Sequence, residues 1–289
     1  MPHGNAPMIR KHAILYVHTE RFVRRPISSR RRHGGNSHSG RPSRRHAQLH
    51  RDRRVIAAVY SSGNHLLDAL PPLELAGLEK DLHIVPLSAR RSTQSAGRAM
   101  NHVDFPIDAV LSVVATLKNG ESVEVATVGR ESFVESDATF DSGVSSRTSF
   151  CQVQGRVQRM TIERFQKHMT TSVPFARLMR HNVRASLFSA QQFTACNVKH
   201  SVLQRCARWL AMTADRVGSP QFRLTQEFLA IMLGVRPALV SEAAEALQRM
   251  GAIEYRQGVV RILDGPALEA SACECYQVCK RAFAESLSN

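Results

Sequence analysis

The chain has 289 residues, of which 43% are hydrophobic, and a formal net charge of +15 at pH 7. This length allows one to three domains with substantial cores. No apolar run approaches the ~18 residues of a membrane span, and the chain start lacks the apolar segment of a secretory signal, so we expect no membrane partner and no export. Six cysteines without extracellular signs indicate reduced thiols and a cytoplasmic protein.

Residues 1–60 form a basic, low-complexity arm. Residues 1–54 hold 14 Lys and Arg against two acidic residues, so the rest of the chain is nearly neutral. Runs such as Arg30-Arg31-Arg32 have too little apolar periodicity to build a core, which predicts a disordered arm. Two alternatives stay open: an extension from a mis-chosen start codon, and an arm that binds DNA phosphates.

Residues 61–170 predict a small β-roll or barrel that begins with two short helices around Pro71-Pro72. Several segments are rich in β-formers or alternate polar and apolar residues, and Asn119-Gly120 is a strong hairpin turn between two of them. Short strands at this spacing are typical of a closed or rolled sheet. The predicted strands cover 102–106, 109–117, 122–128 and 150–160.

Residues 171–200 predict a long helix followed by a hinge. Thr161 to His168 reads as a short helix, and Pro174 can open the next one. The long helix carries an apolar stripe that could pack on its own domain, although we favour a two-fold partner. The stripe consists of Phe175, Leu178, Met179, Val183, Leu187, Ala190 and Phe193. We expect the hinge at 197–200, before a capping box at Ser201 and Gln204.

Residues 201–289 contain the most informative stretch, 224–251, which predicts two short helices around a turn at Gly234. Thr225 is a good N-cap for the first helix, and Pro237 fits the first turn of the second. Apolar residues at i, i+3, i+4 and i+7 give the second helix a buried face, and Gly251 ends it. Alternating residues over 252–263 then predict a β-hairpin, in the order of a winged helix-turn-helix.

Three segments together resemble the Crp/Fnr family of bacterial transcription regulators. They are HVDFPIDAVLSVVATLKNGESVEVATVGRESFV, ACNVKHSVLQRCARWLAM and LTQEFLAIMLGVRP, in family order within about 64–280. The resemblance implies an α+β fold with a cyclic-nucleotide-binding-type β-roll, a long dimerisation helix and a C-terminal winged helix-turn-helix. It implies double-stranded DNA and a second copy of the chain as partners, with RNA polymerase as a further candidate and an effector that the sequence does not identify.

The resemblance also predicts which residues bind DNA. We expect Thr225 and Gln226, at a helix N-terminus, to contact backbone phosphate. We expect the same of Arg256 in the wing. The second helix would present its outer residues to base edges. These outer residues are Arg236, Ala238, Ser241 and Glu242. Better-known members begin this helix with an Arg-Glu pair, which this chain lacks, so their operator is not carried over.

The resemblance further implies a pocket that is degenerate for cyclic AMP. Relatives that bind it use a Gly-Glu pair for the ribose and an Arg-Ser pair for the phosphate. Here Glu135 and Ser136 stand at the first pair, so the ribose acceptor is missing or shifted. Arg147 and Thr148 could still hold an anion, with Arg147 either exposed or paired.

No catalytic constellation and no metal site is expected. Phosphate-binding loops and a His-x3-His pair are absent from the sequence, so we expect no enzyme and no cofactor. Cys273, Cys275 and Cys279 lie in what reads as one helix over 267–283, with no histidine nearby, and packed thiols are favoured over a metal centre. The alternative function is an effector-sensing or interaction protein whose helix-turn-helix no longer binds DNA.

Overall fold

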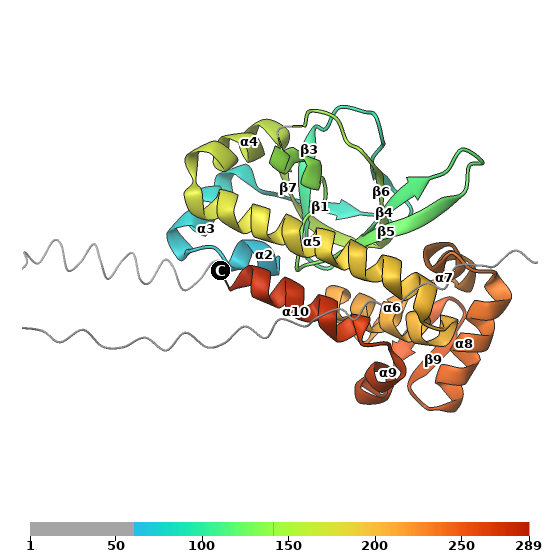
Figure 1. The fold of residues 1–289 in the computed structure, drawn as a ribbon. Helices are drawn as coiled ribbons and strands as arrows, with labels where there is room; N and C mark the ends of the chain where they lie inside the picture. Colours follow the sequence, from blue (N-terminus) through green and yellow to red (C-terminus); the bar gives the residue numbers. More distant parts are fainter. Residues whose placement is uncertain (1–60, 141, 289) are drawn as a thin grey trace, which may run out of the picture.

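The computed structural model describes residues 61–140 and 142–288 (Figure 1). The basic arm expected to be disordered, residues 1–60, lies outside the described residues. None of the described helices combines the length and the apolar character that crossing a lipid bilayer requires.

Two antiparallel sheets build the N-terminal β-roll, with strand orders β1-β7-β3 and β2-β6-β4-β5. The strands are β1 His83–Leu87, β2 Ser92–Gln94, β3 His102–Pro106, β4 Val110–Thr116, β5 Ser122–Val128, β6 Thr148–Val153 and β7 Gly155–Thr161. The predicted strands 102–106, 109–117 and 122–128 are confirmed, and so is the hairpin turn between β4 and β5. Gly120 adopts a φ of 85° there, a conformation that costs glycine little free energy because it has no β-carbon. The predicted stretch 150–160 is divided between β6 and β7, and the sequence analysis did not predict β1 and β2.

Short helices flank the roll on its N-terminal side and at its pocket. They are α2 His65–Asp68, α3 Pro72–Leu78, and the 3-10 turns η1 Glu79–Asp81 and η2 Ser136–Phe140. A core of aromatic rings fills the space between the roll and the helices that follow it. Phe133 stacks on Phe105 with ring centroids 5.6 Å apart, and Phe165 meets Phe175 edge to face at 5.5 Å.

Two helices leave the roll: α4 Ile162–Thr171 and α5 Val173–Lys199. Thr161 and Ser172 cap them by accepting hydrogen bonds from backbone N–H groups, and Pro174 lies in the first turn of α5, as the sequence predicted. The hinge prediction is wrong in extent, because α5 continues through residues 197–199. The chain changes direction only at His200 and Ser201, where the predicted capping box opens α6 Val202–Val217.

The apolar stripe of α5 packs mainly within its own chain. Phe175, Leu178 and Met179 are buried in the core of the β-roll, whereas Leu187 is 60% exposed. The preference for a two-fold partner as the cover of this stripe is therefore not supported. Periodicity identifies an apolar face but does not say whether the same chain or a second copy covers it.

The C-terminal part contains a three-stranded sheet of order β8-β10-β9 among five helices. The elements after α6 are β8 Gln221–Arg223, α7 Gln226–Leu233, α8 Pro237–Arg249, β9 Ile253–Arg256, β10 Val259–Ile262, α9 Gly265–Ser271 and α10 Cys275–Leu287. The predicted single helix over 267–283 is wrong, because residues 272–274 separate α9 from α10. This break lets the chain turn, so that α10 runs back along α5 (Figure 1).

The β-roll and the C-terminal part share an extensive contact through α6 and α7. The Trp209 indole N–H donates to the Glu124 carboxylate at 2.9 Å, and the rings of Phe150 and Phe228 meet edge to face at 5.9 Å. Residues of both parts therefore belong to one hydrophobic cluster.

Candidate nucleic-acid interface and sensor pocket

Helices α7 and α8 form the two-helix unit that the sequence predicted. The Thr225 hydroxyl accepts from the Phe228 N–H at 3.2 Å and caps α7. Gly234 turns the chain with a φ of 62°, a left-handed conformation that favours glycine. Pro237 then opens α8, where its missing N–H leaves no hydrogen bond unmade.

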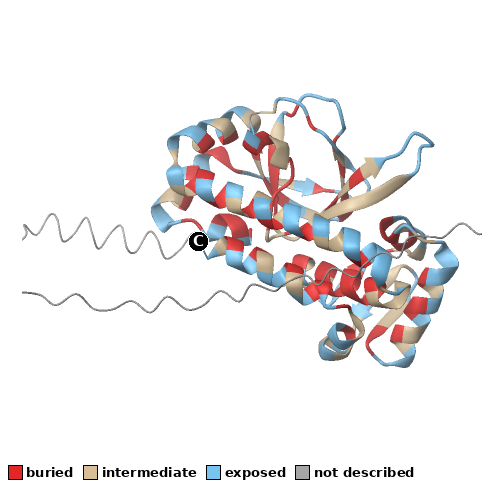
Figure 2. Ribbon diagram, in the orientation of Figure 1, coloured by how far each residue is buried: buried red, intermediate tan, exposed pale blue. Residues whose placement is uncertain are grey.

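Helix α8 has a buried inner face and an exposed outer face (Figure 2). Val240, Ala243, Ala244 and Leu247 are buried, as the periodicity predicted. The exposed outer positions are Arg236, Ala238, Glu242, Glu245 and Arg249. This division leaves the outer face available to a partner without disturbing the core.

Two of the predicted DNA-binding residues bond to each other instead. The Ser241 hydroxyl donates to the Gln226 side-chain carbonyl at 2.6 Å, which ties α8 to the start of α7. Both residues are only half-exposed. Thr225 lines a groove with Arg90 and Phe150 of the β-roll, so the start of α7 faces the N-terminal domain.

The predicted wing is the hairpin of β9 and β10, which turns at Gln257 and Gly258. Arg256 is exposed at this turn, as its predicted role requires. Tyr255 fastens the wing to the helices, because its hydroxyl donates to the Leu224 carbonyl at 2.9 Å. The Tyr255 N–H also donates to the Gln248 side-chain carbonyl of α8 at 3.0 Å, which ties the wing to that helix.

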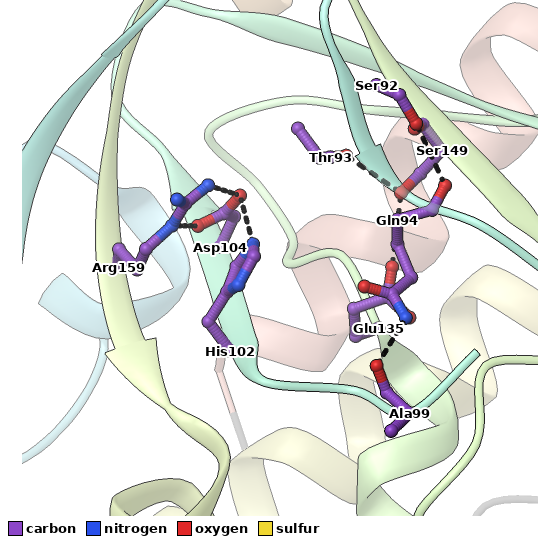
Figure 3. A network of polar contacts seen from close by, with 9 residues as sticks. All are labelled: Ser92, Thr93, Gln94, Ala99, His102, Asp104, Glu135, Ser149 and Arg159. Carbon is purple, nitrogen blue, oxygen red and sulfur yellow. Dashed lines mark hydrogen bonds and ion pairs between the residues drawn. The ribbon is translucent and has the colours of Figure 1, made fainter.

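The β-roll holds a cavity of about 110 Å³ between η2, α5 and α6. Glu135 lies in its wall with a φ of 72°, and its carboxylate accepts from the Ser149 hydroxyl at 3.1 Å (Figure 3). Burial raises the pKa of Glu135 above its usual value. Of the two predicted anion-binding residues, Arg147 lines the cavity and is exposed, whereas the Thr148 hydroxyl accepts from the Ala96 N–H at 3.2 Å.

A second polar network in the roll serves its structure. Asp104 receives two hydrogen bonds of 2.7 Å from the Arg159 guanidinium, and His102 lies 3.5 Å away (Figure 3). Burial alone would raise the pKa of Asp104, but these donors keep it below its usual value. The network joins β3 to β7.

Four residues that the sequence analysis did not combine come together at the end of α5. Cys196, His200, Cys273 and Cys275 place their ligand atoms within 4.8 Å of one another. The expectation that no histidine lies near the C-terminal cysteines is therefore wrong. The spacings Cys-x3-His and Cys-x-Cys were visible in the sequence, but 72 residues separate His200 from Cys273, and only the return of α10 along α5 joins them.

Comparison with known proteins agrees with this geometry. Residues 204–271 match the family of Crp-like helix-turn-helix domains. The matched segment begins within α6 and ends with α9, so it contains the two-helix unit and the wing. Among curated proteins, no relative matches the chain.

Solved structures of Crp/Fnr-type regulators share the fold of about two thirds of this chain. FixK2 from Bradyrhizobium japonicum is similar with a TM-score of 0.56 and 12% identity, over 66% of this chain and 98% of its own. A CRP-family transcriptional regulator from Thermus thermophilus has a TM-score of 0.54 and 18% identity, over 65% and 96%. CLP of Xanthomonas campestris, a c-di-GMP-responsive global regulator, is similar with a TM-score of 0.50 and 17% identity, over 63% of this chain and 94% of its own. At these identities the likeness establishes the fold alone, and it confirms the Crp/Fnr resemblance.

Proposed function

We propose that this chain is a sequence-specific DNA-binding transcription regulator in which α8 enters the major groove. The observation that carries the proposal is that α8, within a segment similar to Crp-like helix-turn-helix domains, buries its apolar face and exposes its outer face. A wing follows directly and is held to the same unit. This arrangement matches the docking geometry of helix-turn-helix proteins on DNA.

Each exposed residue has a role that its chemistry suits. Arg236, at the start of α8, would donate two hydrogen bonds to a guanine, and Glu242 would accept from a cytosine amino group. Ala238 would offer an apolar contact to a thymine methyl. Arg256 would meet phosphate. Gln226 and Ser241 would have to break the hydrogen bond between them before they contact DNA. Thr225 would meet phosphate at the N-terminus of α7.

The test uses fragments selected from the source genome and measures their binding by the full chain at several salt concentrations. We expect Arg236→Ala to weaken the best fragment by about 1–3 kcal/mol, roughly 5- to 150-fold, and to relax one base pair of each half-site. A phosphate contact would instead weaken all fragments alike and lower the salt slope by about one ion. The matched control is Arg177→Ala, an exposed arginine of α5 outside the helix-turn-helix.

A second candidate function rests on two carboxylates on the exposed face of α8. Glu242 and Glu245 are exposed there, and Glu245 lies 3.9 Å from Arg249 on the next turn. Such a face would repel phosphates, which favours an interaction protein whose helix-turn-helix no longer binds DNA. If no genomic fragment shows a salt-dependent affinity, and Arg236→Ala changes nothing, this second function replaces the first.

The β-roll pocket is proposed to be degenerate for cyclic AMP. A cavity of about 110 Å³ is smaller than the roughly 300–1,000 Å³ of small-molecule sites. Glu135 fills the position of the expected glycine and directs its carboxylate to Ser149 rather than into free space. Arg147 stays at the rim, so the pocket lacks the paired ribose and phosphate partners of a nucleotide site.

We also propose that the regulator is a homodimer, because Crp/Fnr regulators bind DNA and typically dimerise. RNA polymerase is a further proposed partner once the dimer is on DNA. The effector stays unidentified. Sedimentation of the full chain tests the dimer, and transcription from a selected fragment with purified polymerase tests the second partner.

A further inference from the structure

The end of α5 and the segment between α9 and α10 meet in a compact cluster of sulfur and nitrogen atoms. Cys196 lies in the last turn of α5, and His200 follows four residues later at its C-cap. Cys273 lies between the two C-terminal helices, and Cys275 is the first residue of α10. The three cysteines are buried, with exposed fractions of 3% or less, and His200 is half-buried.

The distances suit one ion rather than a disulfide. The Cys196 and Cys273 sulfurs are 3.5 Å apart, and the Cys275 sulfur is 3.6 Å from Nδ1 of His200. A disulfide would need about 2.05 Å between sulfurs. Zinc bonds of about 2.3 Å to sulfur and 2.0–2.1 Å to nitrogen separate tetrahedral ligands by roughly 3.6–3.8 Å. A polynuclear cluster would bind its ligands to different metal atoms and hold them further apart.

Neighbouring groups orient the proposed ligands. Nε2 of His200 lies 3.2 Å from the Glu274 carboxylate, which places the Nε2 proton there and leaves the Nδ1 lone pair facing Cys275. The Gln192 side-chain N–H donates to the Cys275 sulfur at 3.2 Å. A carboxylate behind a ligating histidine and a donor on a ligating thiolate are the usual outer partners of a zinc site.

A buried cation supports the site independently. Arg208 is 5% exposed, stacks over the Phe193 ring at 4.2 Å, and its charge acts on both Cys196 and Cys273. Its Nε has no hydrogen-bond partner among the described residues. A buried charge without compensation is costly. Three thiolates around Zn²⁺ carry a net charge of −1, which would offset that of Arg208.

We propose that Cys196, His200, Cys273 and Cys275 bind one zinc ion tetrahedrally. The ion would clamp the connection between α9 and α10 to the end of α5, at the point where the chain turns from the long helix into α6. With four protein ligands the site is closed, which makes it structural rather than catalytic. Cys206 and Cys279 are buried elsewhere and are not ligands.

The first test measures metal content of the full chain after expression with zinc and gel filtration without chelator. We expect one zinc per chain in the natural protein and in the control Cys206→Ala, and a loss to background in Cys196→Ser and Cys273→Ser. Wild-type protein without retained zinc overturns the proposal. So does zinc that persists in both serine variants, because it would then be bound elsewhere, and so does iron with acid-labile sulfide.

The second test needs no variant and therefore does not depend on how the variants fold. Cobalt(II) replaces the zinc, and cysteine alkylation is mapped by mass spectrometry with metal bound and after chelation. We expect the intense visible absorption of tetrahedral cobalt–thiolate coordination and metal-dependent protection of Cys196, Cys273 and Cys275. Weak absorption typical of octahedral cobalt, or equal alkylation in both states, contradicts the site. Neither readout depends on DNA binding.

Discussion

At the scale of single residues, the proposed loss of cyclic AMP binding rests on Glu135. Its φ of 72° is a conformation that costs a residue with a β-carbon of order 1 kcal/mol or more. The hydrogen bond from Ser149 helps to hold its carboxylate in the cavity wall. The position at which nucleotide-binding relatives carry a glycine here carries a side chain that lines the cavity.

We therefore expect cyclic AMP to leave the melting temperature unchanged. A ligand at about 100 times its dissociation constant would add roughly 2.7 kcal/mol, which corresponds to roughly 5–11 °C for a chain of this size. Thermal scans with and without millimolar nucleotide measure the shift. A clear rise that Arg147→Ala abolishes would show that the pocket binds the nucleotide after all.

At the scale of elements, the contact between β5 and α6 joins the β-roll to the C-terminal part through the half-buried residue Glu124. Glu124 accepts hydrogen bonds from Ser112 at 2.7 Å and from the Trp209 indole at 2.9 Å. Burial raises the pKa of Glu124 despite these donors. The folded protein therefore binds a proton here more readily than the unfolded chain does.

The expected consequence is a stability that falls as pH rises through the raised pKa of Glu124, from its ordinary value near 4.5 upward. Glu124→Gln cannot ionise. Its one side-chain oxygen can keep the hydrogen bond from Trp209, and its amide N–H can donate to the Ser112 hydroxyl, which also lies beside the Gln152 side-chain carbonyl. Its melting temperature should match the natural protein at about pH 4 and exceed it by a few degrees at neutral pH. Parallel scans across this range measure the difference. If the difference in melting temperature between the two proteins does not change with pH, ionisation of Glu124 does not lower the stability of the folded protein.

At the scale of the whole molecule, the return of α10 along α5 restricts where a second copy can bind. The inward residues of α5 are already covered by the chain itself. Leu187 and Phe188 remain 60% and 41% exposed on its outer side. We expect a homodimer built on the middle of α5 to use these two side chains.

We expect the full chain to sediment at twice its monomer mass and Leu187→Glu with Phe188→Glu to sediment as a folded monomer. Both side chains are exposed, so the charges should not disturb the core. The matched control is Val173→Glu, at the start of the same helix, where the side chain is 80% exposed. A dimer that survives the double substitution would place the interface on another surface.

The sequence by itself determined the elements whose signals are local. The N-cap Thr225, the left-handed Gly234, Pro237 and the periodicity of α8 act within a few residues, and so the helix-turn-helix and its wing could be predicted together with its exposed face. The strands of the β-roll followed for the same reason, from alternation and a hairpin turn.

Only the tertiary structure decided which surfaces meet. Contacts between separate segments decide whether the stripe of α5 faces its own chain and how Gln226 pairs with Ser241. Such contacts also bring Cys196 and His200 to Cys273 and Cys275. A periodic pattern fixes the direction in which a side chain points from its own helix, but the partner that covers it depends on how the chain folds back. For this reason the metal-ligand cluster could not be inferred from spacing alone.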